Sequence, residues 1–587
     1  MMTGKKFWMT SAAVLALTAT ANAAQPAKEA ANSAQPLQLA QASQVQMAQN
    51  TYAQNSTASG SLEDRVKALE DQLANQNDRA SSDRTRLSTL EQQYNSAVWT
   101  FDNGRPVFAS GDGRFTMAVR LRFQSDYAGF MQSTTHPAGF AGPSDLSSGA
   151  VIRRAYFGVE GKVYNDFSYE IRLNGGGTNG GLNATCTNPT VTSTTVVTGV
   201  PGATTTTTST AAGCAIGGIP SGGEGDPLVN KAVVTYTGIP FWHFSVGVLE
   251  PVLMFEGTTS SASLIFLERP EIDNIAADSF GAGDSRRGIE LGWSKTDTLW
   301  AGDNLAFTGA FTGGKTGTAA THSNGGDENT QVLGRASDRL WTNGLSNIQV
   351  GFSAAKAIYT GNIAGGGAQS LNFQDRPQVR VDGTRLVSTG GMPAKTGNMW
   401  AVDLGGNIDN FFLGGEYAQF TADRQCGVLT ATNNARCTSS AAVIDHPHFG
   451  GWYVEGSWII TGETKAYSSS AINNEVGGFN APVASRPFSL IGGSWGAWEL
   501  VARYSDTNLN WNPLLGATTN TLGTSNLAGV PGGDEKILAL GVNWYLNRNV
   551  RLMIDDNIIK VKKGTAAIPN RDGQNLNVLG VRLQFAN

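Results

Sequence analysis

From residue 98 onward, large apolar residues alternate with polar ones, and this period of two constrains the fold more than any other feature. In residues 115–131 the alternate apolar positions are Phe115, Met117, Val119, Leu121, Phe123 and Tyr127. A β-strand points successive side chains to opposite faces, so the pattern predicts a two-faced strand. With this segment, we predict 16 strands, the others being 149–163, 167–174, 229–238, 241–249, 286–296, 303–312, 345–359, 369–375, 397–408, 411–423, 448–461, 496–508, 535–547, 549–562 and 575–586.

The predicted strands suit a barrel that crosses a membrane. Several exceed the usual strand length in soluble sheets and match the 9–11 residues that cross a bilayer at a tilt. One face is aromatic and aliphatic and the other is charged, whereas a soluble barrel would place apolar side chains inside. We therefore predict an all-β fold, a 16-stranded antiparallel transmembrane β-barrel, wide enough for an aqueous channel. A helical multispan fold is excluded because no central run of 18 apolar residues occurs.

The lengths of the connections follow the parity of an outer-membrane barrel, which has short periplasmic turns and long outer loops. The predicted short turns are 164–166, 238–240, 407–410 and 547–548. The predicted long outer loops are 175–228, 250–285, 313–344, 424–447 and 509–534. Residues 462–495 break the rule, since they are long but fall on the periplasmic side. Two explanations stay open, an additional hairpin in this segment or an error in the strand count.

The four cysteines fall in pairs within two predicted outer loops. Cys186 and Cys214 lie in 175–228, and Cys426 and Cys437 lie in 424–447. Because exported proteins form disulfides, we predict the bridges Cys186–Cys214 and Cys426–Cys437. The alternative is four free thiols.

The N-terminal segment has the composition of an export signal. Two lysines precede an apolar stretch from Phe7 to Thr20, and Ala21-Asn22-Ala23 has the small-residue spacing of a cleavage site. We predict a signal peptide over 1–23, the alternative being a membrane anchor. Residues 24–60 are rich in Ala, Gln, Ser and Asn and predict a disordered, low-complexity tether.

Residues 61–97 follow a heptad pattern. The positions of the seam are Leu62, Val66, Leu69, Leu73, Gln76, Ala80, Asp83, Leu87, Leu90, Tyr94 and Ala97. Their alternating spacing of four and three predicts an oligomerising coiled coil, placed in the periplasm between the tether and a barrel domain over 98–587. A single amphipathic helix folded onto the barrel is the alternative.

Several segments of the barrel region resemble the phosphate-selective porin O and P family of trimeric outer-membrane porins. The matching pieces are Arg153-Arg154-Ala155-Tyr156, Thr259-Ser260-Ser261, Phe266-Leu267-Glu268-Arg269, Arg376-Pro377, Arg385-Leu386-Val387-Ser388-Thr389-Gly390, Tyr453 with Thr461-Gly462-Glu463, Gly496-Ala497-Trp498-Glu499-Leu500, Gly541-Val542-Asn543-Trp544-Tyr545-Leu546-Asn547 and Val581-Arg582-Leu583-Gln584-Phe585. The resemblance implies a homotrimer and a constriction loop at 250–285, which carries Glu250, Glu268 and Arg269. It also implies an anion path through Arg120, Arg153, Arg154, Tyr156 and Arg376, which Arg122 extends.

The chain departs from the family where phosphate-selective members carry the run Arg-x-Arg-Pro-Arg. Here the run is Gln374-Asp375-Arg376-Pro377-Gln378, and Gly257 stands where a lysine is expected. By alternation the inward bases are Arg120, Arg122, Arg154, Lys162, Arg172, Lys231, Arg286, Arg503, Arg551 and Arg582. The inward acids are Asp126, Glu160, Glu170, Glu290, Asp403, Glu416, Glu455, Glu499 and Asp555. This near balance predicts at most a weak preference for anions, phosphate among them, and the alternative is a wall of mutually paired charges.

We therefore expect an outer-membrane porin for passive diffusion of small anions and other small hydrophilic solutes. No catalytic, nucleotide-binding or zinc motif occurs, so we expect no enzyme activity, cofactor or metal site. The net charge of −5 argues against a nucleic-acid partner. The expected partners are outer-membrane lipid and the barrel-assembly machinery, which would read the C-terminal strand. A barrel-anchored adhesin or structural protein with a coiled-coil stalk is the alternative function.

Overall fold

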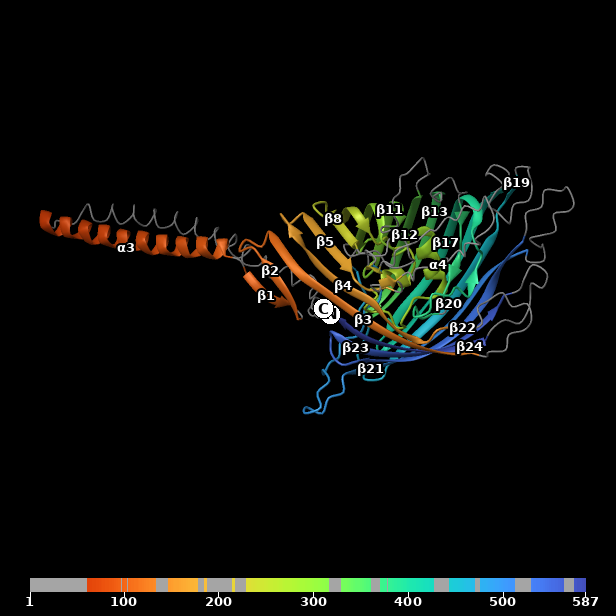
Figure 1. Cartoon of the computed structure of the whole chain (residues 1–587). Coiled ribbons are helices and arrows are strands. Elements are labelled where there is room, and N and C mark those ends of the chain that lie inside the picture. Colours follow the sequence, from red (N-terminus) through yellow and green to blue (C-terminus); the bar gives the residue numbers. More distant parts are fainter. Residues whose placement is uncertain are drawn as a thin grey trace, which may run out of the picture. The chain divides into compact units, whose positions relative to one another are not determined.

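The structure is a computed structural model (Figure 1). It describes residues 61–96, 98–102, 104–132, 146–177, 184–186, 214–216, 229–315, 329–360, 370–376, 378–426, 443–469, 476–512, 529–563 and 575–587. The predicted signal peptide, the predicted tether and Cys437 lie outside the described residues. No helix within these ranges is long and apolar enough to span a membrane.

Sixteen antiparallel strands form a closed barrel, as predicted. They are β3 (Phe115–Gln132), β4 (Gly149–Val163), β5 (Phe167–Asn174), β8 (Val229–Tyr236), β9 (Trp242–Leu249), β10 (Arg286–Thr296), β11 (Asn304–Lys315), β12 (Thr330–Asn343), β13 (Ser346–Tyr359), β17 (Met392–Ile408), β18 (Phe411–Cys426), β20 (His448–Ile459), β21 (Ala497–Trp511), β22 (Val530–Tyr545), β23 (Val550–Lys562) and β24 (Asn575–Ala586). The barrel closes between β24 and β3, where Gln584 pairs with Gln124. Closure leaves no open sheet edge, which the bilayer requires.

The side chains alternate across the barrel wall as the sequence predicts. On β17 and β18, Leu404 and Leu413 are exposed on the outside, whereas Asp403 and Glu416 are buried on the inside. An apolar outer face against lipid and a charged inner face are the reverse of a soluble barrel.

Two strand predictions are wrong, and the errors cancel in the count. The predicted outer loop 313–344 contains barrel strand β12, and the predicted strand 369–375 is not part of the wall. The period of two is weak in strand β12 because small residues, Gly334 and Ala336, occupy outward positions, and because a bulge near Arg339 shifts its register. Residues 370–376 form only the short pieces β14 (Ser370–Leu371) and β15 (Gln374–Asp375), and β15 pairs with β16 (Val387–Ser388).

Two outer connections fold into the barrel and build an internal core. Residues 250–285 carry the 3-10 turn η1 (Glu256–Thr258) and helix α4 (Glu271–Phe280), which ends at Gly281 with φ +79°. The connection between β13 and β17 packs against α4, because the ring of Phe280 lies 6.1 Å from that of Phe373. Phe373 also contacts Phe420 and Phe449 of the wall. The lumen is therefore narrowed by packed side chains.

The long connection between β20 and β21 is not an additional pair of barrel strands, because β20 pairs directly with β21. Its first part folds inward. Lys465 forms a buried ion pair with Glu499 at 3.0 Å, and the ring of Phe479 lies 5.2 Å from that of Phe412 and 6.3 Å from that of Phe255. The constriction loop thus meets a second segment that enters from the opposite end of the barrel. Strand β19 (Val443–Asp445) prolongs the sheet beside β18.

The chain divides into two compact units. The smaller comprises the described residues up to Arg120 together with Val159–Glu170 and Thr235–Gly238. It contains helix α3 (Leu62–Asn95) and the hairpin of β1 (Val98–Asp102) and β2 (Arg105–Ala109). Helix α3 begins with a reciprocal cap, since the amide of Asp64 donates to Ser61 Oγ and the amide of Ser61 donates to Asp64 Oδ2.

Candidate functional site

A cluster of arginines surrounds one glutamate of the constriction loop. Glu268 lies 2.7 Å from Arg153 Nε, 3.1 Å from Arg582 Nη2 and 3.4 Å from Arg380 Nε. These residues come from β4, from β24 and from the connection between β13 and β17, so three distant segments meet at one carboxylate. Burial raises the pKa of Glu268, but Arg153, Arg380, Arg154 and Arg582 outweigh it and hold this pKa well below its ordinary value.

The Thr-Ser-Ser segment of the loop docks on the same sector of the wall. Arg122 donates to the hydroxyls of Ser261 and Ser260, at 2.6 and 2.9 Å. Arg154 donates to Gln124 Oε1 at 2.9 Å and forms no ion pair within the described part of the chain. Positive charge and hydroxyl groups therefore converge at the point where the loop meets β3 and β4.

Tyr156 lies between two arginines. Its ring centroid is 5.5 Å from the guanidinium carbon of Arg122 and 4.9 Å from that of Arg172. Arg172 also forms an ion pair with Glu250 of the constriction loop. The tyrosine face thus holds both guanidinium planes in fixed positions.

The remaining predicted site residues have more local partners. Arg120 belongs to the smaller unit, where it contacts Glu160 at 3.1 Å and Glu170 at 3.2 Å. Arg269 donates to carbonyl groups of its own loop, at Glu256 and Thr259. Arg376 is buried in the connection between β13 and β17. The structure therefore does not bring Arg120 or Arg269 into the cluster around Glu268.

Carboxylates gather on another sector of the wall, on β17, β18 and β20. Asp403 receives two hydrogen bonds from Arg335, at 2.6 and 3.0 Å, and Glu416 accepts from the amide of Phe255 at 3.2 Å. Neither oxygen of Asp273 on α4 accepts a hydrogen bond from the described residues. Burial, together with Glu256, raises the pKa of Asp273 well above its ordinary value. The lumen therefore has a basic sector, around Glu268, and an acidic sector, around Asp403, Glu416 and Asp273.

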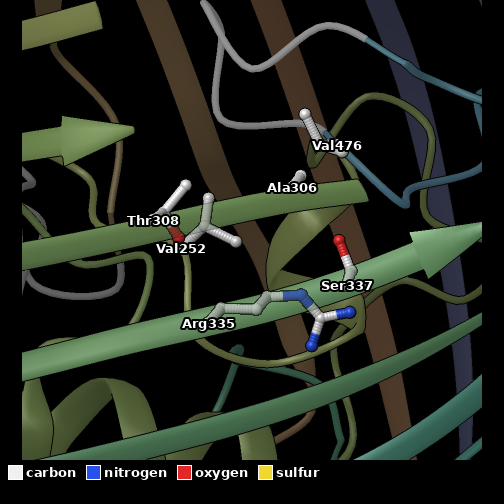
Figure 2. A pocket seen from close by; sticks show the side chains of 6 residues that line it. All are labelled: Val252, Ala306, Thr308, Arg335, Ser337 and Val476. Carbon is white, nitrogen blue, oxygen red and sulfur yellow. The ribbon is translucent and has the colours of Figure 1, made fainter. Parts of the chain in front are cut away.

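Figure 2 shows where the constriction loop and the inward connection meet β11 and β12. A small cavity there, of about 10 Å³, is lined by Val252, Ala306, Thr308, Arg335, Ser337 and Val476. This is roughly the smallest space that holds one water molecule. The inserted segments are thus closely packed against this part of the wall.

Three functional residues could not be found from the sequence pattern. Arg335 lies on the missed strand β12, and Arg380 lies in a loop with no periodicity. Lys465 lies two residues after Glu463 in a long connection without periodicity. Among the residues that the structure describes, no group of three or more His, Cys, Asp or Glu side chains could hold a metal ion.

A closed barrel with an apolar outer face, a charged lumen and inserted loops defines the class of outer-membrane channels. Residues 117–586 match the family described as phosphate-selective porin O and P, and the chain belongs to this family. It is therefore an outer-membrane porin, as the resemblance predicts.

Comparison with solved structures gives distant likenesses. The anion-selective porin from Comamonas acidovorans has 11% identity and a TM-score of 0.38, with 81% of this chain and 100% of that chain covered. The outer membrane channel DcaP of Acinetobacter baumannii has 9% identity and a TM-score of 0.38, covering 81% and 97%. OmpT of Vibrio cholerae has 10% identity and a TM-score of 0.38, covering 81% and 98%. At this level the likenesses carry no functional argument, and no curated protein matches.

Proposed function

We propose that this porin passes small hydrophilic solutes by diffusion, with a weak preference for anions, phosphate among them. The observation that carries the proposal is the sharing of Glu268 by Arg153, Arg380 and Arg582, with Arg154 close by. Two carboxylates face these four guanidinium groups, Glu268 and Asp126, which pairs with Arg582 at 2.6 Å, so a net positive potential remains beside the constriction loop. Anions entering a narrowed lumen would be stabilised by this potential.

The preference is expected to be weak because an acidic sector shares the lumen. The carboxylates of β17, β18 and β20 are buried in the same barrel, and Asp403 is already balanced by Arg335. An anion that passes both sectors is attracted by the basic sector, whereas the acidic sector adds no further attraction. The family run that would add further arginines near Arg376 is also absent.

The variant Arg154→Gln tests the proposal. Arg154 forms an ion pair with no carboxylate among the described residues, so its replacement removes a positive charge without leaving a buried negative charge unpaired. The reversal potential across a KCl gradient should shift toward cations, while the conductance remains close to that of the wild type. The control Arg548→Gln removes the same charge from an exposed turn. Equal reversal potentials in all three proteins would show that the arginine cluster is only a structural wall.

A homotrimer with a periplasmic coiled coil is part of the proposal. The seam residues Leu62, Val66, Leu69 and Leu73 of α3 are 48–80% exposed in the single chain, which supports burial against other copies. Chemical cross-linking should give three copies, and deletion of 61–97 should weaken the trimer but leave conductance intact. A conducting monomer of the full chain would contradict this assembly.

The disulfide Cys186–Cys214 is also proposed. Strands β6 (Ala184–Cys186) and β7 (Cys214–Ile216) pair these two residues directly across the ladder. Opposed residues of an antiparallel pair have Cα atoms about 4.5–5.5 Å apart, within the range that a disulfide spans. Peptide mapping without reductant should recover both the Cys186–Cys214 link and the Cys426–Cys437 link. Recovery of free thiols would contradict it.

A further inference from the structure

The second part of the connection between β20 and β21 turns outward. Residues 486–496 form a small hairpin in which the amides of Ser489 and Ser494 each donate to the other's carbonyl, at 2.9 and 3.1 Å. Gly493 supplies a positive φ of +64° at the turn, and Gly492 donates to Ser489 Oγ. The hairpin therefore has a defined conformation, and Figure 1 shows it projecting away from the wall beside β21 and β23.

The base of the hairpin is fixed to the outer face of the barrel by aromatic residues. The indole groups of Trp498 and Trp544 both donate to the carbonyl of Trp495, at 3.2 and 2.7 Å. The ring of Phe488 contacts that of Trp544 at 5.1 Å, and its amide donates to Leu546. Trp498 and Trp544 alternate along their strands with buried residues, so they belong to the lipid-facing set.

The tip of the hairpin is apolar and exposed. Leu490 is 77% exposed, Ile491 is fully exposed, and Trp495 is 62% exposed. Residues 481–496 contain one charge, Arg486, and no carboxylate. Such a tip would be costly in water but can enter an apolar phase without desolvating a charge.

Its position corresponds to a membrane interface. The connection lies at the end of the barrel that carries the short turns, which in outer-membrane barrels is the periplasmic end. Aromatic side chains mark the level of the lipid head groups, and the stacked pair Phe411 and Trp458, 5.7 Å apart, lies at this same end. Phe488, Trp495, Trp498 and Trp544 continue that belt onto the hairpin.

We propose that the hairpin 486–496 is a membrane anchor, whose tip inserts Leu490 and Ile491 into the inner, phospholipid leaflet of the outer membrane. Its partner is the lipid surface. The backbone groups that Ser489 and Ser494 pair with each other need no water in a partly dehydrated site. Arg486, at the base, lies where it can meet lipid phosphate groups.

Labelling of the tip tests the anchor. The variant Ile491→Cys of the full chain is coupled to an environment-sensitive fluorophore and placed in phospholipid nanodiscs, with or without brominated acyl chains. We expect blue-shifted emission that is largely lost with the brominated lipid. The control Arg548→Cys, in the polar turn between β22 and β23, should keep water-like, unquenched emission. Wild-type protein treated with the same reagent gives the background from the native cysteines.

Other outcomes overturn the proposal. Water-like emission from position 491 in both lipids would show that the tip lies in the aqueous phase, free for a periplasmic protein. Unquenched emission together with cross-linking from position 491 to another copy would place the tip in a contact between subunits. Because Ile491 is fully exposed, its replacement should leave the barrel folded.

Discussion

Replacing Glu268 with glutamine should raise the anion preference of the channel. Glutamine keeps the shape of the side chain but removes the negative charge that Arg153, Arg380 and Arg582 share. The pKa of Glu268 lies well below its ordinary value, so in the wild type the charge is present throughout the neutral and mildly acidic range. The substitution therefore adds one net positive charge to the basic sector at any such pH.

The size of the effect follows from Coulomb's law. For an anion passing about 7 Å away, one added positive charge contributes about 0.6 kcal/mol in water and about 2.4 kcal/mol at an effective dielectric constant of about 20. Since about 1.4 kcal/mol corresponds to a tenfold ratio, even the aqueous limit changes anion entry about threefold. Cation entry changes in the opposite sense, which increases the change in the permeability ratio.

The assay is the reversal potential across a KCl gradient in planar bilayers. The control Glu70→Gln makes the same charge change on the exposed helix α3. Folding of each variant is checked by heat-dependent gel mobility, because breaking a buried ion-pair set costs about 3–5 kcal/mol. If folded Glu268→Gln channels keep the wild-type reversal potential, the Glu268 cluster does not face the conducting path, and our explanation of anion preference is wrong.

Three further predictions concern stability and assembly. Burial and Glu271 raise the pKa of Asp375 to about 8, so the fold favours the neutral acid. The free energy of unfolding should therefore fall as pH rises from about 4 to about 8. In thermal melting, the variant Asp375→Asn should show a smaller fall over this pH range than the wild type. Lys465→Met leaves the buried Glu499 without its ion-pair partner and should lower the free energy of unfolding by about 3–5 kcal/mol in denaturant titrations. The double variant Lys465→Met, Glu499→Gln should recover part of this loss. Phe585, on the outward face of the closing strand β24, is expected to belong to the signal that the barrel-assembly machinery reads; Phe585→Ala should reduce the amount of protein in outer-membrane fractions, and normal amounts would place the signal elsewhere.

The barrel wall was predictable because lipid imposes one simple rule on every strand. Alternation placed Arg122 and Arg154 on the inner face correctly, and both are buried there. The rule failed at β12, where two successive outward positions, Gly334 and Ala336, are small. It also failed at 369–375, because Phe373 is buried in the lumen and not against lipid. An alternating pattern identifies an apolar position, but it does not show whether the side chain faces lipid or the packed interior of the barrel.

The lumen contacts depend on tertiary packing that no local pattern encodes. Glu268 and Arg582 are separated by more than half of the chain, and Arg380 reaches the same carboxylate from a loop without periodicity. The connection between β20 and β21 turns inward at Lys465 and outward at Trp495, although its composition shows only a long loop. The sequence therefore indicated the charges of the lumen but not their partition into sectors.

The central claim is that this porin conducts through a lumen with a weak anion preference. The most direct test is the single-channel reversal potential of the wild-type protein, first across a KCl gradient and then with phosphate replacing chloride on one side. We predict a modest potential of the sign of anion selectivity, with phosphate permeant but not strongly preferred over chloride. A cation-selective reversal potential, or a strong preference for phosphate, would contradict the account.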